Sequence, residues 1–433
     1  MLRHRRRQAC DRADPRHLEC RRLRGGQADL SHEPRTLRPD ELRAARNLFL
    51  GALLHPVLDD EGWARRKGAY EPDRTWGVHS DDQIVGTATS YPCRMAVPGG
   101  AVLDTAAVTQ VGVRSDHTRR GLLSALMRAQ LDDLLVRGEV LAALHATEAR
   151  IYGRFGYGVA TRARGVRLRR SGRGLRPTAP LEGAVRLLAP DDVGPVTAAV
   201  HDRIALRRPG MLTRGETWWR SPAERAQQDK RSVLVAAHAG QDGVDGFVVA
   251  STAGGHSATR SLDVEDMHAD GPHATAALWR FLLDVDLVGE VTAWGRPLDE
   301  PLDLLLADPH DLTVTGVGDE LWLRLVDVPA ALAARSFGAA APVLLGVHDP
   351  LLEDNAGVYR IAGGTAERVE PLGGPVAPQI ECDVAALAMA YLGDRRPAEL
   401  AATGWWTVHD PDALEQIDAA FATPTVPWCG TMF

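Results

Sequence analysis

The segment from residue 106 to residue 135 constrains the fold of this chain more than any other. An apolar strand over 106–113 runs into a loop that ends at Gly121, and leucine and methionine residues then recur at helical spacing. A helix that begins after a strand and a glycine leaves several backbone N–H groups unpaired, and these donors together with the helix dipole bind phosphate. The segment therefore predicts a strand, loop and helix that can hold a phosphorylated ligand.

The loop itself supports this interpretation without proving it. Arg119 and Arg120 place positive charge where a pyrophosphate would lie, and Gly121 allows close approach of the backbone. An ordinary strand-to-helix turn with solvated arginines explains the same residues equally well. The nucleotide P-loop pattern and the glycine spacing of a dinucleotide-binding fold are both missing.

Length and composition indicate a globular protein of more than one domain. A chain of 433 residues exceeds what one hydrophobic core organises, and its 45% hydrophobic and 25% charged residues are typical of globular proteins. The formal net charge of −7 gives no reason to expect nucleic acid as a partner, and it suits weak attraction of a small cation.

Local patterns divide the chain into four parts. Residues 1–34 are rich in arginine and lack periodicity, so we expect a disordered extension; a basic arm that touches nucleic acid or anionic lipid is the alternative. A helix begins near Pro39, and its apolar face is formed by Leu42, Ala45, Phe49 and Leu53. Strand-like runs at 75–79, 84–90, 95–97 and 102–103 form two hairpins before the segment described above. This order indicates an α+β domain that ends near residue 170.

The second block resembles a degenerate copy of the first. It has a strand over Val185–Leu188, a helix start at Pro190 and a hairpin formed by 233–238 and 246–250. The third block, from residue 326 to residue 433, has strands over 343–348 and 357–361 and a helix over Asp383–Tyr391.

Cysteine usage and hydropathy indicate the compartment. The five cysteines form no CxxC pair, so we expect neither disulfides nor a metal site. The chain has no apolar run long enough to cross a bilayer and no secretory signal. We therefore expect a cytoplasmic protein with no membrane partner.

Two strings of the sequence resemble a known family. The strand, the arginine pair, Gly121 and the helix look like the acetyl-CoA signature of the GNAT superfamily, and His145–Gly158 (HATEARIYGRFGYG) is similar to the enhanced intracellular survival (Eis) acetyltransferases. The resemblance covers about residues 36–433 and includes the terminal phenylalanine. It implies an α+β chain with an N-terminal GNAT domain at 35–175, a second, degenerate GNAT-like domain at 176–325 and a sterol-carrier-protein-like domain at 326–433. It further implies a homo-hexamer in which only the first domain binds acetyl-CoA.

The same resemblance implies the cofactor site. The backbone of Val111 and Val113 would hold the acetyl and pantetheine groups, the amides of residues 119–123 would hold the pyrophosphate, and Thr147 stands where the family has serine. The implied cofactor residues are Val111, Gly112, Val113, Arg119, Arg120, Gly121, Leu122, Leu123 and Thr147. Thr118 departs from the superfamily motif, and we expect it to weaken cofactor binding.

The chemistry needs a proton acceptor for the amine and a proton donor for the departing thiolate. Tyr152 can donate, because a phenol of pKa about 10 is protonated at neutral pH; an aromatic packing residue is its alternative role. By resemblance, the base is the terminal carboxylate of Phe433, which would act mainly through charge and position because its pKa is about 3.5. A frayed terminus is the alternative, although the tail is apolar and contains Pro427.

The amine site is the least determined part. Asp59, Asp60, Glu61 and Trp63 follow the first helix and could attract and stack a cationic amine, but a solvated loop is as plausible. Met432 stands where the family's member best known for drug resistance has an acidic residue, which argues against strong polycation binding. We expect an acetyl-CoA-dependent N-acetyltransferase for an aminoglycoside-like or lysine-like amine. The alternative is a non-catalytic protein that binds lipid or another small molecule through its C-terminal domain.

Overall fold

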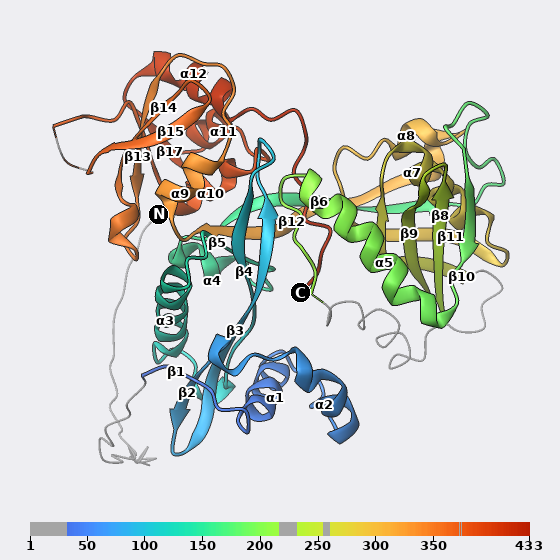
Figure 1. Cartoon of the computed structure of the whole chain (residues 1–433), viewed down its shortest axis with the longest axis horizontal. Coiled ribbons are helices and arrows are strands. Elements are labelled where there is room, and N and C mark those ends of the chain that lie inside the picture. Colours follow the sequence, from blue (N-terminus) through green and yellow to red (C-terminus); the bar gives the residue numbers. More distant parts are fainter. Residues whose placement is uncertain (1–32, 216–231, 254–259, 372, 374) are drawn as a thin grey trace, which may run out of the picture.

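The computed structural model describes residues 33–215, 232–253, 260–371, 373 and 375–433. The expected N-terminal extension, residues 1–34, lies outside the described residues apart from Glu33 and Pro34. Figure 1 shows three units, with the first unit in blue and teal, the second in green and yellow, and the third in orange and red.

The first unit has the predicted order of elements. Its helices and strands are β1 (Arg35–Thr36), α1 (Leu42–Ala52), α2 (Asp60–Arg66), β2 (Thr75–Ser80), β3 (Gln83–Ala96), β4 (Val102–Val113), α3 (Leu122–Val136), β5 (Leu141–Leu144), α4 (Ala149–Tyr152) and β6 (Gly158–Arg169). Asp81 and Asp82 adopt positive φ angles of 50° and 60°, which the tight turn between β2 and β3 requires. The runs predicted at 95–97 and 102–103 are not separate short strands, because they continue β3 and β4 in one antiparallel register.

The second unit repeats this arrangement. Its elements are β7 (Ala184–Leu187), α5 (Pro190–Ile204), β8 (Val233–Gly240), β9 (Gly243–Ala253), β10 (Arg260–Ala269), α7 (Pro272–Asp284), β11 (Val288–Arg296), α8 (Leu302–Leu305) and β12 (Leu312–Leu325). Within the described residues, one sheet joins both units in the order β1-β2-β3-β4-β5-β12-β6-β11-β10-β9-β8-β7.

One strand of the second unit lies inside the sheet of the first. β12 pairs with β5 from Trp322 opposite Leu144 to Leu325 opposite Leu141, and its other edge pairs with β6. β6 in turn pairs with β11 of the second unit. The boundary that we expect near residue 175 therefore divides the chain in sequence, whereas in space the two units share strands.

The third unit is a smaller α+β body. Its elements are α9 (Val328–Ala334), β13 (Val343–His348), β14 (Gly357–Ala362), β15 (Thr365–Glu370), β16 (Ile380–Asp383), α10 (Val384–Tyr391), α11 (Pro397–Ala402), β17 (Trp406–Val408) and α12 (Pro411–Phe421). Asp383 caps α10 by accepting a hydrogen bond from the Ala386 amide at 2.7 Å. Tyr391, Phe421 and Trp406 are buried together and fill the centre of this unit.

The glycines of the 153–158 string let the third unit pack on the first. Gly156 has a φ of +83°, and a Cβ at Gly158 would collide with the Ala385 carbonyl of α10. Beside them, Arg324 of β12 and Asp349 form a fully buried ion pair at 2.6 Å. These contacts fix α10 against β6, close to the end of α4.

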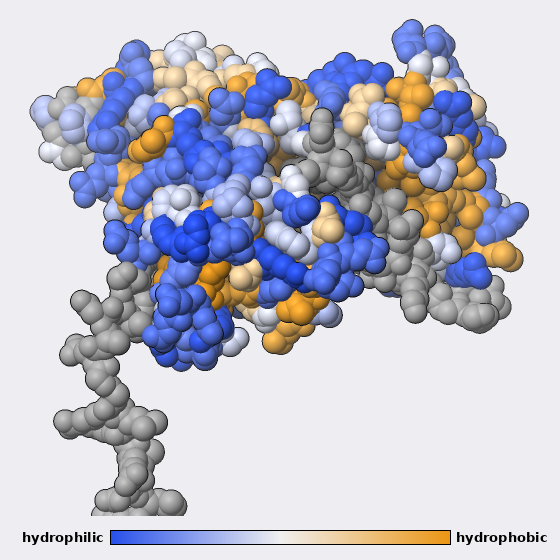
Figure 2. Space-filling model, turned by 60° about the horizontal axis from the view of Figure 1, so that its bottom comes forward, coloured by the Kyte–Doolittle hydropathy of each residue, from blue (hydrophilic) through white to orange (hydrophobic). Residues whose placement is uncertain are grey.

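Apolar side chains also reach the surface in a few places. Figure 2 shows that apolar areas on this face are separated by hydrophilic ones, with an extended apolar area toward the second unit. Exposed large apolar residues of that unit include Leu187, Leu287, Trp294, Leu304, Val314 and Val317. None of the helices in the described ranges is long and apolar enough to cross a membrane.

Candidate active site

The site is built around the point where β4 and β5 separate. The two strands pair in parallel only from Thr105 opposite Leu141 to Ala107 opposite Ala143, while β4 continues to Val113. Along a strand, the backbone N–H and C=O groups of successive residues point alternately toward one neighbouring strand and then the other. The Arg114 amide points toward β3, where it donates to the Val85 carbonyl. Val113 and Val111 therefore direct their amide and carbonyl groups toward the gap, where an extended ligand could pair with them.

A β-bulge turns one side chain to the other face of the sheet. Thr87 is opposite Gly112 and Thr89 is opposite Thr109, so Gln110 and Val111 share a single partner, and Gln110 has a φ of 53°. Val111 and Val113 consequently pack on the α3 side, whereas the buried Gln110 amide donates to the Tyr91 hydroxyl at 2.9 Å on the α1 side. Gly112 is required for packing, since a Cβ there would lie 3.3 Å from the Phe49 Cα.

The loop before α3 has the geometry of an anion site. Gly121 caps α3 with a φ of +83°, and Arg119 has a φ of +62°. A Cβ at Gly121 would meet no atom within 4 Å, so the space above the helix start is open. The first amides of a helix, here those of residues 122–124, lack intrahelical partners. Arg120 donates to the Asp116 carbonyl at 3.1 Å and Thr118 to the Ser115 carbonyl at 3.2 Å, so both side chains brace the loop.

The remaining predicted cofactor residues lie at the edges of this site. Leu122 is buried and Leu123 half-buried in the core beneath α3, so they offer only their backbone amides. Thr147 is exposed in the bend between β5 and α4. Among the described residues, no group of three His, Cys, Asp or Glu side chains is arranged to hold a metal ion.

Tyr152 ends α4 and is 7% exposed. It packs with residues of β4, β5 and α3, and its ring meets Tyr157 edge-on at 6.1 Å between centroids. Burial raises the pKa of Tyr152 to about 12, and the nearby Glu148 charge acts in the same direction. The phenol is therefore protonated across the neutral range.

The chain ends beside β5. The ring of Phe433 lies 4.7 Å from the His145 ring, measured between centroids. His145 directs Nδ1 to the Glu320 carbonyl at 2.7 Å and Nε2 to the Thr431 carbonyl at 2.8 Å. Figure 1 shows that the C-terminus lies between the two GNAT-like units and away from the third unit, to which its residues belong in sequence.

Glu320 of β12 fixes the tail where it passes between the units. Its carboxylate accepts hydrogen bonds from the Gly430 amide at 2.8 Å, the Cys429 amide at 3.1 Å and the Thr161 hydroxyl at 2.8 Å. Burial raises the pKa of Glu320, and these hydrogen bonds oppose the rise.

The second unit holds the same tail from the other side. Arg214 forms an ion pair with Asp266 at 2.6 Å and donates to the Gly430 carbonyl at 2.8 Å and the Thr431 hydroxyl at 3.0 Å. The Trp428 indole donates to the Gly295 carbonyl at 2.7 Å. The terminus is thus anchored by residues of both units, which a frayed end would not be.

The residues predicted to bind the amine lie on α2 and are already engaged. Asp59 caps α2 by accepting from the Gly62 amide at 2.7 Å. Asp60 pairs with Arg43 at 2.7 Å and Glu61 with Arg65 at 2.6 Å, both on the exposed surface. Trp63 packs against Tyr70, with 5.4 Å between ring centroids.

A small polar cluster on the α1 side was not predicted. Gln110 of β4 and Tyr91 of β3 are joined by a hydrogen bond, and Arg46 of α1 and Tyr70 lie close enough to these two residues to interact with them electrostatically. Arg46 is half-buried, with its guanidinium 5.3 Å from the centre of the Phe49 ring. The sequence offered only a weak signal for it, because Arg46 lies on the flank of the amphipathic helix predicted there.

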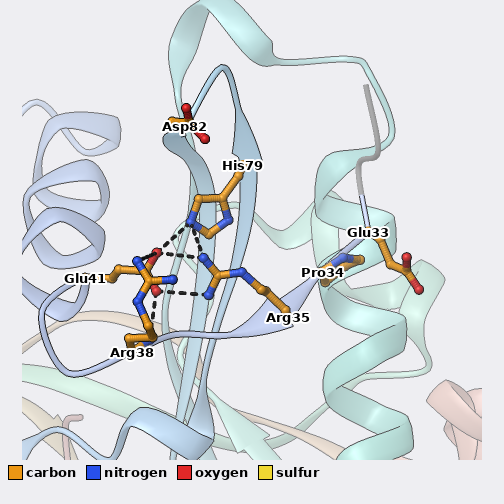
Figure 3. Close-up of a pocket in the computed structure, with 7 residues that line it drawn as sticks. All are labelled: Glu33, Pro34, Arg35, Arg38, Glu41, His79 and Asp82. Atoms are coloured by element: carbon orange, nitrogen blue, oxygen red, sulfur yellow. Dashed lines mark hydrogen bonds and ion pairs between the residues drawn. The ribbon is translucent and has the colours of Figure 1, made fainter. Parts of the chain in front are cut away.

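A surface hollow near the described N-terminal end is lined by charged side chains that pair with one another. Figure 3 shows Arg35, Arg38 and His79 gathered around Glu41 at the start of α1. Glu41 pairs with Arg35 at 2.7 Å and with Arg38 and His79 at 3.1 Å. The hydrogen bond from Arg35 is the main reason that the pKa of Glu41 falls to about 2. These groups satisfy one another and tie β1 and β2 to α1, so we assign the hollow no part in the site.

Comparison with known families covers all three units. Residues 33–160 match the family described as acetyltransferase (GNAT) domain, residues 210–325 match a second family with the same description, and residues 328–430 match the sterol carrier protein domain. The predicted fold, two tandem GNAT-like domains followed by a sterol-carrier-protein-like domain, is confirmed.

Individual relatives extend over nearly the whole chain. An uncharacterized N-acetyltransferase of Streptomyces coelicolor is 36% identical over 92% of this chain and 99% of its own length. The N-acetyltransferase Eis of Mycobacterium bovis is 32% identical over 80% of this chain and 85% of its own length. The crystal structure of Eis1 from Mycobacterium abscessus matches with a TM-score of 0.82 at 36% identity, covering 93% of this chain and 100% of that one.

Proposed function

Because the chain belongs to the Eis family of GNAT N-acetyltransferases, we propose that it transfers the acetyl group of acetyl-CoA to a primary amine. Membership of this family identifies the chain as an acyltransferase that uses a coenzyme A-bound acyl donor. The choice of acetyl-CoA, the catalytic residues and the amine are our proposals. The observation that carries them is the anchoring of the C-terminal residue beside His145, at the end of β5.

The first unit offers a site that fits the acyl donor. The unpaired edge of β4 at Val111 and Val113 would pair with the extended pantetheine arm, as a further strand does. The open space at Gly121, the free amides of α3 and the exposed Arg119 and Arg120 would hold the pyrophosphate. The donor supplies the thioester, which is the electrophile of the reaction.

Two groups of the chain would move the protons. The amine nitrogen forms a bond to the acetyl carbon while the bond from that carbon to sulfur breaks. The Phe433 carboxylate takes the proton from the amine, directly or through water, and Tyr152 gives its proton to the sulfur. The raised pKa of Tyr152 keeps the phenol protonated, so a proton is available to the sulfur as its bond to the acetyl carbon breaks.

The proposed acceptor is an aminoglycoside-like or lysine-like amine. The lipid-carrier alternative has less support, because large side chains such as Tyr391 and Phe421 fill the centre of the third unit. Release of free thiol from acetyl-CoA should be measured with an aminoglycoside, a lysine peptide, a polyamine and an arylalkylamine. We expect at least one amine to accelerate thiol release, and no acceleration by any of these classes would contradict the proposal.

A further inference from the structure

The polar cluster of Arg46, Tyr70, Tyr91 and Gln110 contains more hydrogen-bond donors than acceptors. The guanidinium of Arg46 carries five N–H donors. Its Nε is buried without a hydrogen-bond partner, and no carboxylate of the described residues pairs with it. The Tyr91 oxygen accepts from Gln110, so its own hydrogen remains available to donate. The amide oxygen of Gln110 is the main acceptor within the cluster.

The burial of the cluster makes its surplus of hydrogen-bond donors unfavourable in the absence of a ligand. Burial raises the pKa of both Tyr70 and Tyr91, and the charge of Arg46 opposes the rise in each case. The cation therefore lies close enough to act on two largely buried phenols. A half-buried cation without an anionic partner is unfavourable, and a ligand that supplies an oxyanion would relieve it.

The cluster also lies where an acceptor substrate would bind. Gln110 directly precedes Val111, the first residue of the open edge of β4, and the bulge turns it to the α1 side of the sheet. Tyr91 and Phe433 pack against the same core cluster, whereas Tyr152 packs with α3 on the other side. An acceptor bound on the α1 side of the sheet would therefore lie on the same side as Arg46 and Phe433, whose carboxylate is the proposed base.

The acidic residues of α2 do not make this side strongly negative. Asp60 and Glu61 are each matched by an arginine, and Asp59 is used as a helix cap. Arg46 has no such match among the described side chains. Glu71 is a further carboxylate whose charge acts on Tyr91, but it is exposed and forms no ion pair with Arg46 among the described side chains. The charges next to β4 therefore do not favour a simple polycation as the acceptor.

We propose that the acceptor carries a carboxylate as well as its amine, in the manner of an amino acid, and that Arg46 binds this carboxylate with help from Tyr91. The proposal rests on the acetyl transfer proposed above and narrows its substrate class. The planar guanidinium suits a carboxylate, which it can bind through two parallel hydrogen bonds.

Matched acceptor pairs test the proposal. Phenylalanine, lysine and 4-aminobutyrate should each be compared with the corresponding carboxamide, using thiol release for kcat/KM and calorimetry in the presence of coenzyme A for binding. We expect the carboxylate form of at least one pair to be favoured by about tenfold to 100-fold, which is the size of a charge-assisted hydrogen bond.

Three variants test whether Arg46 causes the preference for the carboxylate form. Arg46→Met keeps the volume of the side chain and should abolish the preference for the carboxylate form, mainly by raising the KM of that form. Arg46→Lys keeps the charge and should retain part of the preference. Arg128→Met removes an exposed arginine of α3, on the other face of the sheet, and should leave the preference unchanged. If Arg46→Met fails to fold, the Arg46→Lys variant and the wild-type pairs still decide the question.

The outcomes separate this proposal from the one on which it rests. Thiol release without any preference for the carboxylate form, or a preference that survives Arg46→Met, would overturn the role of Arg46 and leave acetyl transfer intact. Calorimetric preference for the carboxylate form that disappears in Arg46→Met, with no thiol release from any amine, would support this site and contradict acetyl transfer.

Discussion

Tyr152 is the residue whose environment most directly suits a chemical role. Tyr152→Phe removes only the hydroxyl, so the packing against Tyr157 should survive. We expect kcat to fall by about 10²-fold, as for loss of a general acid, with unchanged affinity for acetyl-CoA. Since burial raises the pKa of Tyr152 to about 12, the wild-type kcat should not decline between pH 7 and pH 10 through loss of this proton. Steady-state kinetics over that range measure both effects, and a Phe variant with wild-type kcat would exclude Tyr152 as the acid.

Substitutions at Gly121 test the proposed pyrophosphate site. Gly121→Asp introduces a negative charge at the start of α3 and a side chain at a φ of +83°, and both should abolish binding of acetyl-CoA. Gly121→Ala is the matched control, because it shares the backbone strain without the charge and should weaken binding less. A Cβ here meets no protein atom within 4 Å and both variants share the same backbone strain, so a difference in affinity between them reports the added charge. Calorimetry that shows equal affinity in the Asp variant and the wild type would refute the assignment.

Residue identity alone predicted part of the site. The predicted anion-binding loop at 119–123 follows from a local pattern, because a strand, a glycine and a helix start lie within fifteen residues of one another, whereas the backbone groups at 111–113 were implied by the family resemblance. The cluster of Arg46, Tyr91 and Gln110 does not follow from a local pattern, because its members meet only after the bulge in β4 reverses the orientation of Gln110. A bulge adds one residue to a strand and leaves no distinct signal in the sequence.

The C-terminal tail is the element that links the three units to the proposed chemistry. A few residues added after Phe433 would move its carboxylate from the position beside His145. We expect kcat to fall by about 10²-fold, since displacement of about 1 Å can have this effect, while affinity for acetyl-CoA stays unchanged. The same extension placed at the N-terminus serves as the control. Full turnover by the C-terminally extended protein would mean that another group, such as Asp59, Asp60 or Glu61, is the base.

The junction of β6 and α10 gives a prediction about stability. Gly158→Ala would drive a Cβ into the Ala385 carbonyl of α10, and backbone atoms cannot move aside easily. We expect the free energy of unfolding to fall by about 1–3 kcal/mol, the usual effect of overpacking. Gly153→Ala, where a Cβ would meet nothing within 4 Å, should be neutral by comparison. Thermal or urea unfolding measures the difference, and equal stability of the two variants would show that this contact is not tight.

Element identities were predicted more successfully than element partners. The helix over Leu42–Ala52, the turn at Asp81–Asp82 and the strand over Val343–His348 each follow from local spacing and turn residues. The insertion of β12 between β5 and β6 does not, because strand pairing depends on contacts between residues more than 140 positions apart. The same holds for the tail, whose anchors Arg214 and Glu320 are more than 100 residues from Gly430.

At the scale of the whole molecule, the surface of the second unit suggests assembly. Leu287 and Leu304 are 71% and 63% exposed, and the described residues of this unit include four more exposed large apolar side chains. Figure 2 shows an extended apolar area on this part of the molecule. Contiguous apolar surface of this kind is common at contacts between subunits.

We therefore predict a homo-hexamer, as the family resemblance implies, held in part through the second unit. Light scattering at micromolar concentration should give a mass of six chains of 46.8 kDa, and removal of residues 1–34 should not change the number of chains. Leu304→Glu replaces an exposed apolar side chain of the second unit with a charged one and should shift the mass downward. Leu54→Glu, at a similarly exposed position of the first unit, should not. A monomeric wild type would contradict the prediction, and because the tail is anchored within one chain by Arg214, Glu320 and His145, acetyl transfer would then be expected from the monomer itself.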